Sequence, residues 1–164
     1  MKKGKTTVAS LLIVLVTLGL DQWTKWAVEK SIALNDTVEM INHFFYLTYV
    51  RNTGAGFSMF VGAGMGFFAA LTIIALVGMV YMFFKTKDSR YQICLSLVFS
   101  GAIGNFIDRM TLGFVRDFFS FYIFGYPFPV FNVADISITV GIALILVSMF
   151  IDDKKEQERW KQES

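Results

Sequence analysis

The feature that most constrains the fold of this chain is a series of four long apolar stretches. They lie at about residues 8–28, 59–84, 91–109 and 133–151, and each has close to the roughly 20 residues that a helix needs to cross a bilayer. A hydrophobic content of 55% and a mean hydropathy of +0.55 are too high for a soluble domain of 164 residues. We therefore expect an all-α membrane protein in which residues 1–164 form one integral membrane domain, a bundle of four transmembrane helices.

Lysine and arginine residues cluster in three segments that alternate with two long loops. Ten of the 15 lie before the first stretch, between the second and third, and after the fourth: Lys2, Lys3, Lys5, Lys85, Lys87, Arg90, Lys154, Lys155, Arg159 and Lys161. Positive residues favour the cytoplasmic side of a membrane. Both termini are then expected in the cytoplasm, and the loops 29–58 and 110–132 on the outer side.

The two outer loops differ in composition. Residues 37–41 and 45–50 are typical of two short strands and predict a small extracytoplasmic β-sheet element. Residues 110–131 are rich in aromatic side chains, which favour an interfacial loop or helix. These side chains are Phe114, Phe118, Phe119, Phe121, Tyr122, Phe124, Tyr126, Phe128 and Phe131. The segment is suited to covering an apolar substrate, or equally to being a plain membrane anchor.

Four groups of polar residues fall at the ends of the apolar stretches that face outward. They are Asp21 with Lys25, Asn52 with Gly54, Asn105 with Asp108 and Arg109, and Asn132 with Asp135. Because consecutive stretches cross the membrane in opposite directions, all four groups are expected at one level, the outer membrane interface.

Each group also has a purely structural explanation. Asp21 and Lys25 are four residues apart and can form an ordinary ion pair on one helical face. The group that ends the third stretch also shares one face, and its side chains can bond to one another or to neighbouring backbone. Asn132 can cap the fourth helix, and Asp135 in its first turn can favour the helix dipole.

Asp117 is the residue that favours chemistry over structure. It follows Arg116 within an otherwise apolar and aromatic segment, which is a costly position for a carboxylate. If Asp117 and Asp135 lie within a few ångströms, they share a proton and titrate as a pair. One carboxylate can then activate water while the other protonates a substrate carbonyl. The sequence thus suggests a hydrolase embedded in the membrane.

Other kinds of site have little support in the composition. With a single His and a single Cys there is no histidine and cysteine cluster for zinc. The chain has no Gly-rich phosphate loop, and a net charge of +2 gives no broad basic face for nucleic acid. We expect neither a metal nor an organic cofactor.

Five motifs in order resemble those of bacterial lipoprotein signal peptidase, also called signal peptidase II. They are Asp21-Gln22-Trp23-Thr24-Lys25, Asn52-Thr53-Gly54-Ala55-Gly56-Phe57, Gly104-Asn105-Phe106-Ile107-Asp108-Arg109, Val115-Arg116-Asp117-Phe118 and Phe131-Asn132-Val133-Ala134-Asp135. Gly56 and Ile136 depart from the residues common in that family, and both departures concern packing more than chemistry.

The resemblance implies an aspartyl endopeptidase of the bacterial cytoplasmic membrane, with its active site at the outer leaflet. Its substrate would be a prolipoprotein, cut just before a cysteine that carries a diacylglyceryl group, and globomycin would inhibit it. Asp117 and Asp135 match the catalytic pair. The matching positions that shape the site or hold substrate and inhibitor are Asn52, Gly54, Asn105, Asp108, Arg109, Asn132, Ala134, Asp21 and Lys25. Membrane lipids are further expected partners, nucleic acid is not, and the protein is expected to be a monomer.

Two alternatives belong to other classes. A serine/lysine membrane peptidase would need a serine beside Lys25, and Ser31, Ser58 and Ser120 lie on the outer side. A small proton-coupled transporter would also use membrane carboxylates, but near the midplane rather than at one face.

Overall fold

The computed structural model describes residues 3–54 and 65–163. The start of the second apolar stretch at residue 59, the departure at Gly56 and the candidate Ser58 lie outside the described residues. The elements in chain order are α1 (Lys3–Ser31), β1 (Thr37–Ile41), β2 (Phe45–Asn52), α2 (Met65–Lys85), α3 (Ser89–Leu112), β3 (Val115–Ile123), β4 (Tyr126–Pro127) and α4 (Val133–Glu163).

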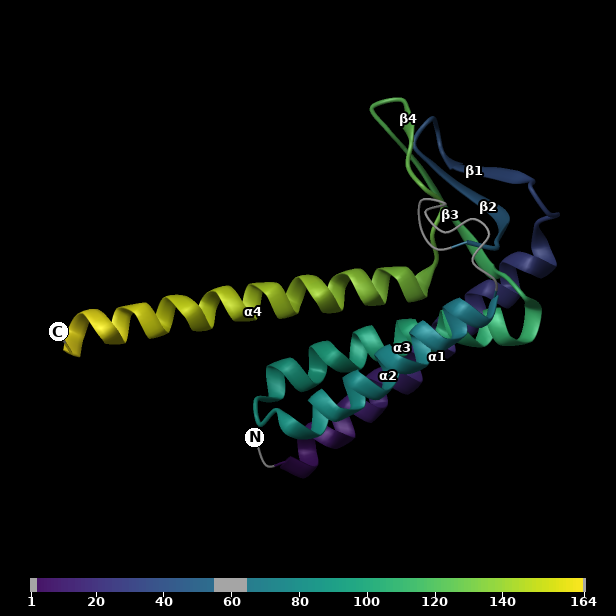
Figure 1. Ribbon diagram of the computed structural model, residues 1–164. Helices are drawn as coiled ribbons and strands as arrows, with labels where there is room; N and C mark the ends of the chain where they lie inside the picture. Colours follow the sequence, from purple (N-terminus) through teal and green to yellow (C-terminus); the bar gives the residue numbers. More distant parts are fainter. Residues whose placement is uncertain (1–2, 55–64, 164) are drawn as a thin grey trace.

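Four helices in the described part of the chain are long and apolar enough to cross a membrane, which confirms the expected number of spans. Leucine, valine and phenylalanine side chains on α1, α2 and α4 are largely exposed, as suits surfaces that face lipid rather than water. The first and last helices are longer than their apolar stretches: α1 begins at Lys3, and α4 continues to Glu163. The last part of α4 extends beyond the other helices (Figure 1).

α3 is the central helix of the bundle. It packs against α1, α2 and α4. In the most apolar 18-residue stretch of α3, 44% of the residues are buried, compared with 6% in the corresponding stretch of α2. Asp88 caps its start by accepting a hydrogen bond from the N–H of Arg90. Gly113 ends it with φ of 82°, a left-handed conformation that glycine adopts without strain. The chain turns there directly into β3.

A four-stranded antiparallel sheet with the order β1-β2-β3-β4 stands at one end of the helices. Figure 1 shows it beside the last turns of α1 and α3 and the first turn of α4. A small core of Val28, Ile32, Tyr49 and Phe118 joins α1 to the sheet. The sheet therefore has a fixed position over the end of the bundle, and strands as well as helices can contribute to a site there.

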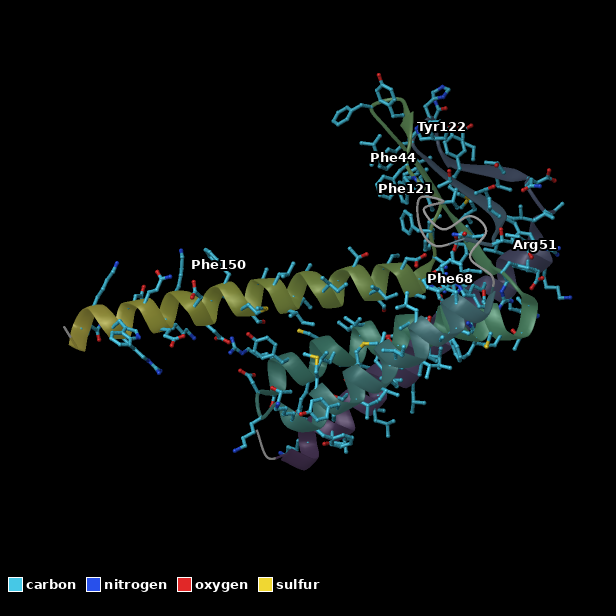
Figure 2. All side chains as sticks on the ribbon, viewed as in Figure 1. Phe44, Arg51, Phe68, Phe121, Tyr122 and Phe150 are labelled. Atoms are coloured by element: carbon cyan, nitrogen blue, oxygen red, sulfur yellow. The ribbon has the colours of Figure 1, made fainter. Side chains whose placement is uncertain are left out.

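The aromatic segment after α3 is a β-hairpin, where a loop or helix was expected. β3 pairs with β2 so that Phe121 lies opposite Phe45, and their rings stack with centres 4.7 Å apart. Figure 2 shows Phe121 and Tyr122 on β3 and, close to them, Phe44 from the turn between β1 and β2. Aromatic residues are well suited to strands because their rings pack across neighbouring chains. The aromatic composition of this segment was therefore compatible with an interfacial helix and with a strand, and the pairing with β2 determined that it is a strand.

Candidate active site

α1 contributes a buried ion pair. Nζ of Lys25 lies 2.8 Å from Oδ2 of Asp21, and the two side chains are 0% and 1% exposed. Nζ also donates to Oδ1 of Asn105 at 2.9 Å and lies 3.7 Å from Oδ2 of Asp108. Oδ1 of Asp21 accepts a bond of 2.9 Å from the backbone N–H of Ala134. Because buried charges must be paired, this pair connects α1 to both α3 and the start of α4.

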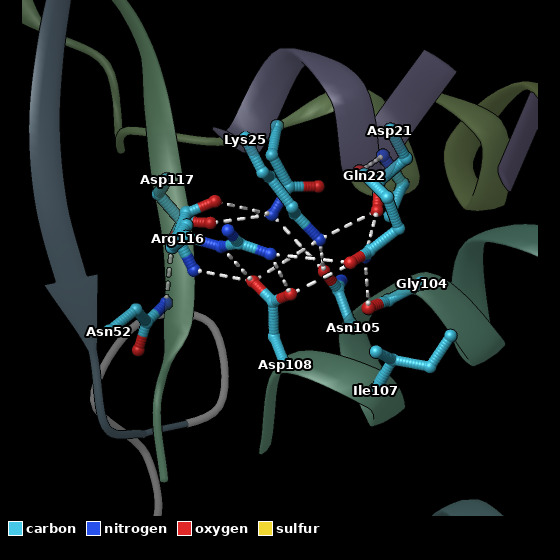
Figure 3. Close-up of polar contacts among 12 residues, drawn as sticks. Asp21, Gln22, Lys25, Asn52, Gly104, Asn105, Ile107, Asp108, Arg116 and Asp117 are labelled. Atoms are coloured by element: carbon cyan, nitrogen blue, oxygen red, sulfur yellow. Dashed lines mark hydrogen bonds and ion pairs between the residues drawn. The ribbon is translucent and has the colours of Figure 1, made fainter. Parts of the chain in front are cut away.

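Asp108, on α3, is bound by Arg116 at the start of β3. Its carboxylate accepts bonds from the backbone N, Nε and Nη2 of Arg116 at 3.0, 3.1 and 2.8 Å. The guanidinium also donates to Glu29 at 3.0 Å and to Gln22 at 3.2 Å, both on α1. Burial alone would lower the pKa of Arg116, but the bonds and charges of Asp108 and Glu29 outweigh it and raise the pKa. These contacts hold the start of β3 in place, and Asp117 is the residue that follows Arg116 on this strand (Figure 3).

Asn132 donates to both carboxylates of the candidate catalytic pair. Its Nδ2 lies 2.6 Å from Oδ1 of Asp117, and its backbone N–H donates to Oδ2 of Asp135 at 3.1 Å. Nδ2 of Asn105 donates to Oδ1 of Asp135 at 2.8 Å, and Oδ1 of Asn105 is 3.1 Å from Nδ2 of Asn132. Two aspartates that are 18 positions apart in the sequence are thus joined by two asparagine side chains.

Asp117 is 3% exposed. Burial and the charge of Asp135 together raise its pKa to about 6, against the opposing effect of hydrogen bonds from Asn52 and Asn132. Nδ2 of Asn52 donates to Oδ2 of Asp117 at 2.9 Å, while its Oδ1 accepts from the N–H of Gly54 at 3.0 Å. The turn at Gly54 therefore fixes which end of the Asn52 amide faces the carboxylate.

Asn132 caps the start of α4, as expected, and it does so while it makes the contacts described above. Oδ1 of Asn132 accepts from the N–H of Asp135 at 3.0 Å, and Oδ2 of Asp135 accepts in turn from the N–H of Asn132. This reciprocal pair is a capping box. The structural and chemical explanations of Asn132 and Asp135 are therefore compatible, because the cap also orients the Asp135 carboxylate.

The four aspartates of the site fall into two classes. Asp21 and Asp108 form ion pairs with Lys25 and Arg116. Among the described residues, no lysine or arginine nitrogen lies within 4.0 Å of a carboxylate oxygen of Asp117 or Asp135. These two carboxylates accept amide N–H bonds instead, and neutral donors leave them free to exchange a proton.

Arg109 has a different environment from Asn105 and Asp108, although all three share one face of α3. Its Cζ lies 5.7 Å from the centre of the Phe68 ring on α2. From their spacing, these three side chains could have bonded to one another. Instead, the side chains of Asn105 and Asp108 bond to residues of α1, β3 and α4.

Ala134 is fully buried where three helices meet. A Cβ atom placed on Gly104 would lie 3.3 Å from the Cβ of Ala134 and 2.5 Å from Oδ2 of Asp21. A Cβ on Gly101 would collide with the carbonyl oxygen of Ala134. The glycines of α3 thus allow α1 and α4 to approach closely enough for the polar contacts to form.

Gln22, Glu29 and Arg116 also belong to the site, although no role was expected for them from the sequence. Gln22 donates to Asp108, at 3.3 Å, and all three take part in the same hydrogen-bond network. For the two residues on α1, the spacing along the sequence could have indicated a role. Gln22, Lys25 and Glu29 recur at intervals of three and four residues and so share one face of α1.

The arrangement is suited to acid and base chemistry with a water molecule. Two neighbouring carboxyl groups that share a proton can act as base and acid in one step. In the described part of the chain, no three His, Cys, Asp or Glu side chains are grouped so as to hold a metal ion.

Comparison with known proteins identifies the family. A family model described as signal peptidase (SPase) II matches residues 13–151. Lipoprotein signal peptidases of Staphylococcus aureus strains JH9 and Newman are 43% identical over 155 residues, which cover 91% of this chain and 93% of each relative.

Two solved structures are similar throughout. A bacterial membrane enzyme determined by the in meso method at 2.3 Å resolution has a TM-score of 0.84 and 41% identity, covering 90% of both chains. A second, at 1.9 Å resolution, has a TM-score of 0.79 and 42% identity, covering 86% of this chain and 92% of the other. The chain therefore belongs to the signal peptidase II family and is a membrane peptidase that processes prolipoproteins.

Proposed function

We propose that Asp117 and Asp135 are the catalytic pair, and that the enzyme cuts a prolipoprotein just before its diacylglyceryl-modified cysteine. The observation that carries this proposal is that Asn132 donates to both carboxylates, at 2.6 and 3.1 Å. The absence of a paired cation within 4.0 Å of either one, in the described residues, separates them from Asp21 and Asp108. The latter two stabilise the fold.

The reaction is direct attack by water. One carboxylate of the pair removes a proton from a water molecule while the oxygen of that water adds to the scissile carbonyl carbon. The other carboxyl group donates its proton to the carbonyl oxygen as negative charge develops there. When the tetrahedral intermediate collapses, the carbon–nitrogen bond breaks, the leaving amine takes a proton from the first carboxyl group, and a hydroxyl of the intermediate returns a proton to the second carboxylate. No acyl-enzyme forms.

The remaining polar residues position this pair. Asn52 and Asn132 hold Asp117, while Asn105 holds Asp135. Asp21 and Lys25 support Asn105 and Ala134. Arg109 and Gly54 are the residues beside the catalytic pair that we expect to contact substrate or an inhibitor of the globomycin type.

The site faces the outer leaflet of the cytoplasmic membrane, and both termini are cytoplasmic. The support is that Lys5, Lys85 and the basic residues after Asp152 all lie at helix ends remote from the sheet. A cysteine scan in a Cys94→Ser background tests this arrangement. In intact cells an impermeant maleimide should label Phe124→Cys, which is 96% exposed in the wild type, and should leave Lys155→Cys unlabelled. The opposite pattern would reverse the orientation.

The alternative serine/lysine mechanism has less support. Lys25 is in an ion pair with Asp21 and donates to Asn105, so it is not an available base. Ser31 is exposed, and Ser120 lies opposite Tyr46 in the sheet. Nothing in the described residues favours a transporter, whose carboxylates would lie near the middle of a span.

The test is cleavage of a diacylglyceryl-modified prolipoprotein by purified protein in detergent, followed as a gel shift. Asp117→Asn and Asp135→Asn should each lose cleavage, by roughly 10⁴-fold or more, and each should still unfold cooperatively, as a folded protein does. The matched control Asp36→Asn, an exposed carboxylate at the same face, should cleave normally. Cleavage by both folded variants would refute the aspartate pair, and Ser31→Ala and Ser120→Ala would then be measured.

A further inference from the structure

Glu29, near the end of α1, bonds to both strands that lead to the candidate active site. Its Oε1 accepts from the hydroxyl of Tyr49 on β2 at 3.1 Å, and its Oε2 accepts from Nη1 of Arg116 on β3 at 3.0 Å. Asn52 follows Tyr49 by three positions, and Asp117 directly follows Arg116. One carboxylate therefore connects the two strands that carry the hydrogen bond of 2.9 Å between Asn52 and Asp117.

A β-bulge lies between β2 and β3 just before these two residues. Leu47 is opposite Phe119 and Val50 is opposite Asp117, so β2 advances three positions while β3 advances two. A bulge interrupts the ladder of backbone hydrogen bonds, and a slip of one residue turns every side chain of a strand to the other face. The side of β2 on which Asn52 lies therefore depends on where this bulge is fixed.

Tyr49 lies within the bulge, and its backbone bonds to the loop after α1. Its N–H donates to the carbonyl of Asp36 at 3.3 Å, and its carbonyl accepts from the N–H of Asn35 at 2.8 Å. Its side chain is 3% exposed and packs in the small core between α1 and the sheet. The bond from its hydroxyl to Glu29 thus ties the bulge to α1 and, through Arg116, to β3.

Arg116 is also held independently of Glu29, by three bonds to Asp108. Figure 3 shows its side chain directed toward Asp108. The side chain of Glu29 is 30% exposed, and pairs of this kind contribute little to stability. Among the described residues, none of its hydrogen bonds or ion pairs involves Asp117 or Asp135. Loss of Glu29 therefore leaves the reacting groups and the start of β3 in place and releases β2.

From these contacts we propose that Glu29 is a positioning residue for peptide cleavage. By bonding to Tyr49 and Arg116 at once, it fixes the bulge and keeps Asn52 against Asp117. This inference rests on the assignment of Asp117 to the catalytic pair.

Cleavage kinetics of the purified full-length protein in detergent test the proposal, with a diacylglyceryl-modified prolipoprotein as substrate. Glu29→Ala should lower kcat by about 10-fold and leave KM nearly unchanged, because a misplaced carboxylate slows the chemical step. Glu29→Gln, whose amide oxygen still accepts one of the two bonds, should lose less. In the matched control Glu39→Ala, the lost carboxylate accepts from the hydroxyl of Tyr46 in the same sheet, at 3.2 Å, and kcat should stay at the wild-type value. A wild-type kcat for Glu29→Ala would overturn the role of Glu29.

A double-mutant cycle separates positioning from a general loss of stability. If Glu29 acts by holding Asn52, adding Glu29→Ala to Asn52→Ala should slow cleavage no further. Effects that multiply would overturn the proposal, because Glu29 would then act by another route. Tyr49→Phe keeps the buried ring and removes only the hydroxyl. It should show the same loss of kcat and the same lack of additivity, and it decides the question if Glu29→Ala does not fold.

The same assay separates this inference from the aspartate pair. If Asp117→Asn still cleaves, the catalytic assignment fails and the role of Glu29 fails with it. If Asp117→Asn is inactive while Glu29→Ala and Tyr49→Phe match wild type, only the role of Glu29 fails.

Discussion

Nζ of Lys25 lies 2.9 Å from Oδ1 of Asn105, and this contact determines which way the Asn105 amide faces. With its oxygen turned toward an ammonium group, Asn105 presents its Nδ2 to Asp135, at 2.8 Å. A charge on α1 thus orients a carboxylate on α4 through an amide on α3. This relationship explains why Asp21 and Lys25 belong to the site although neither belongs to the proposed catalytic pair.

Replacing Lys25 by methionine should lower both activity and stability. The change leaves Asp21 without its partner and removes the donor that orients Asn105. Breaking a buried ion pair costs about 3–5 kcal/mol, and a misplaced carboxylate lowers kcat by about 100-fold. Thermal unfolding in detergent and cleavage kinetics measure the two effects. Lys30→Met, at the exposed end of the same helix, is the matched control. Normal kcat in a folded Lys25→Met protein would contradict the role of Lys25.

Asn52→Ala should shift the pH dependence of kcat/KM toward higher pH. The hydrogen bond from Asn52 stabilises ionised Asp117, so its loss raises the pKa of Asp117 further above about 6. A proton required by the pair is then retained to higher pH. The limb of the profile that falls with rising pH should move up by about one unit. Thr53→Ala, an exposed neighbour, should leave the profile unchanged, and a shift of Asn52→Ala to lower pH would contradict the assignment.

Asp117→Asn should have a pH-dependent effect on stability. The pKa of Asp117 is about 6 in the folded protein and 3.8 in its ordinary state. Above pH 6 the folded wild type therefore carries the full cost of a buried charge, and this cost disappears as the pH falls toward 3.8. The free energy of unfolding of Asp117→Asn relative to wild type should thus fall between pH 7 and pH 4, by up to about 3 kcal/mol. A relative stability that is constant with pH, or that rises as the pH falls, would be evidence against a raised pKa.

Gly101→Ala should destabilise the protein strongly, whereas Gly78→Ala should not. A Cβ atom on Gly101 meets the backbone carbonyl of Ala134, which cannot move without displacing α4. The expected loss is about 2–3 kcal/mol, with loss of activity because Asp135 follows Ala134. Gly78 lies within α2 with nothing within 4 Å of its added Cβ, so alanine there should stabilise the helix by about 0.5–1 kcal/mol. Melting temperatures compare the two, and equal effects would show that α3 and α4 can separate without cost.

The number of helices and the level of the polar residues were predictable because they follow from local properties. A run of apolar residues of sufficient length favours a span wherever it occurs, and the four described helices agree with that expectation. The short strands at residues 37–41 and 45–50 were also predicted from local alternation, and they are β1 and β2. β3 was not, because its aromatic residues suit an interfacial helix, a loop or a strand until β2 is placed beside it.

By itself, the sequence determined the membrane class, the expected positions of the polar groups and, through its motifs, the family. Only the tertiary structure decided how those groups are paired. Asp21, Asp108, Asp117 and Asp135 are chemically identical side chains, and their surroundings distinguish them: Lys25 and Arg116 neutralise the first two, and asparagine amides hold the others. The physical reason is that hydrogen bonds and ion pairs act over about 3 Å, whereas these partners lie up to 113 positions apart in the chain. Their selection therefore depends on how closely α1, α3 and α4 pack.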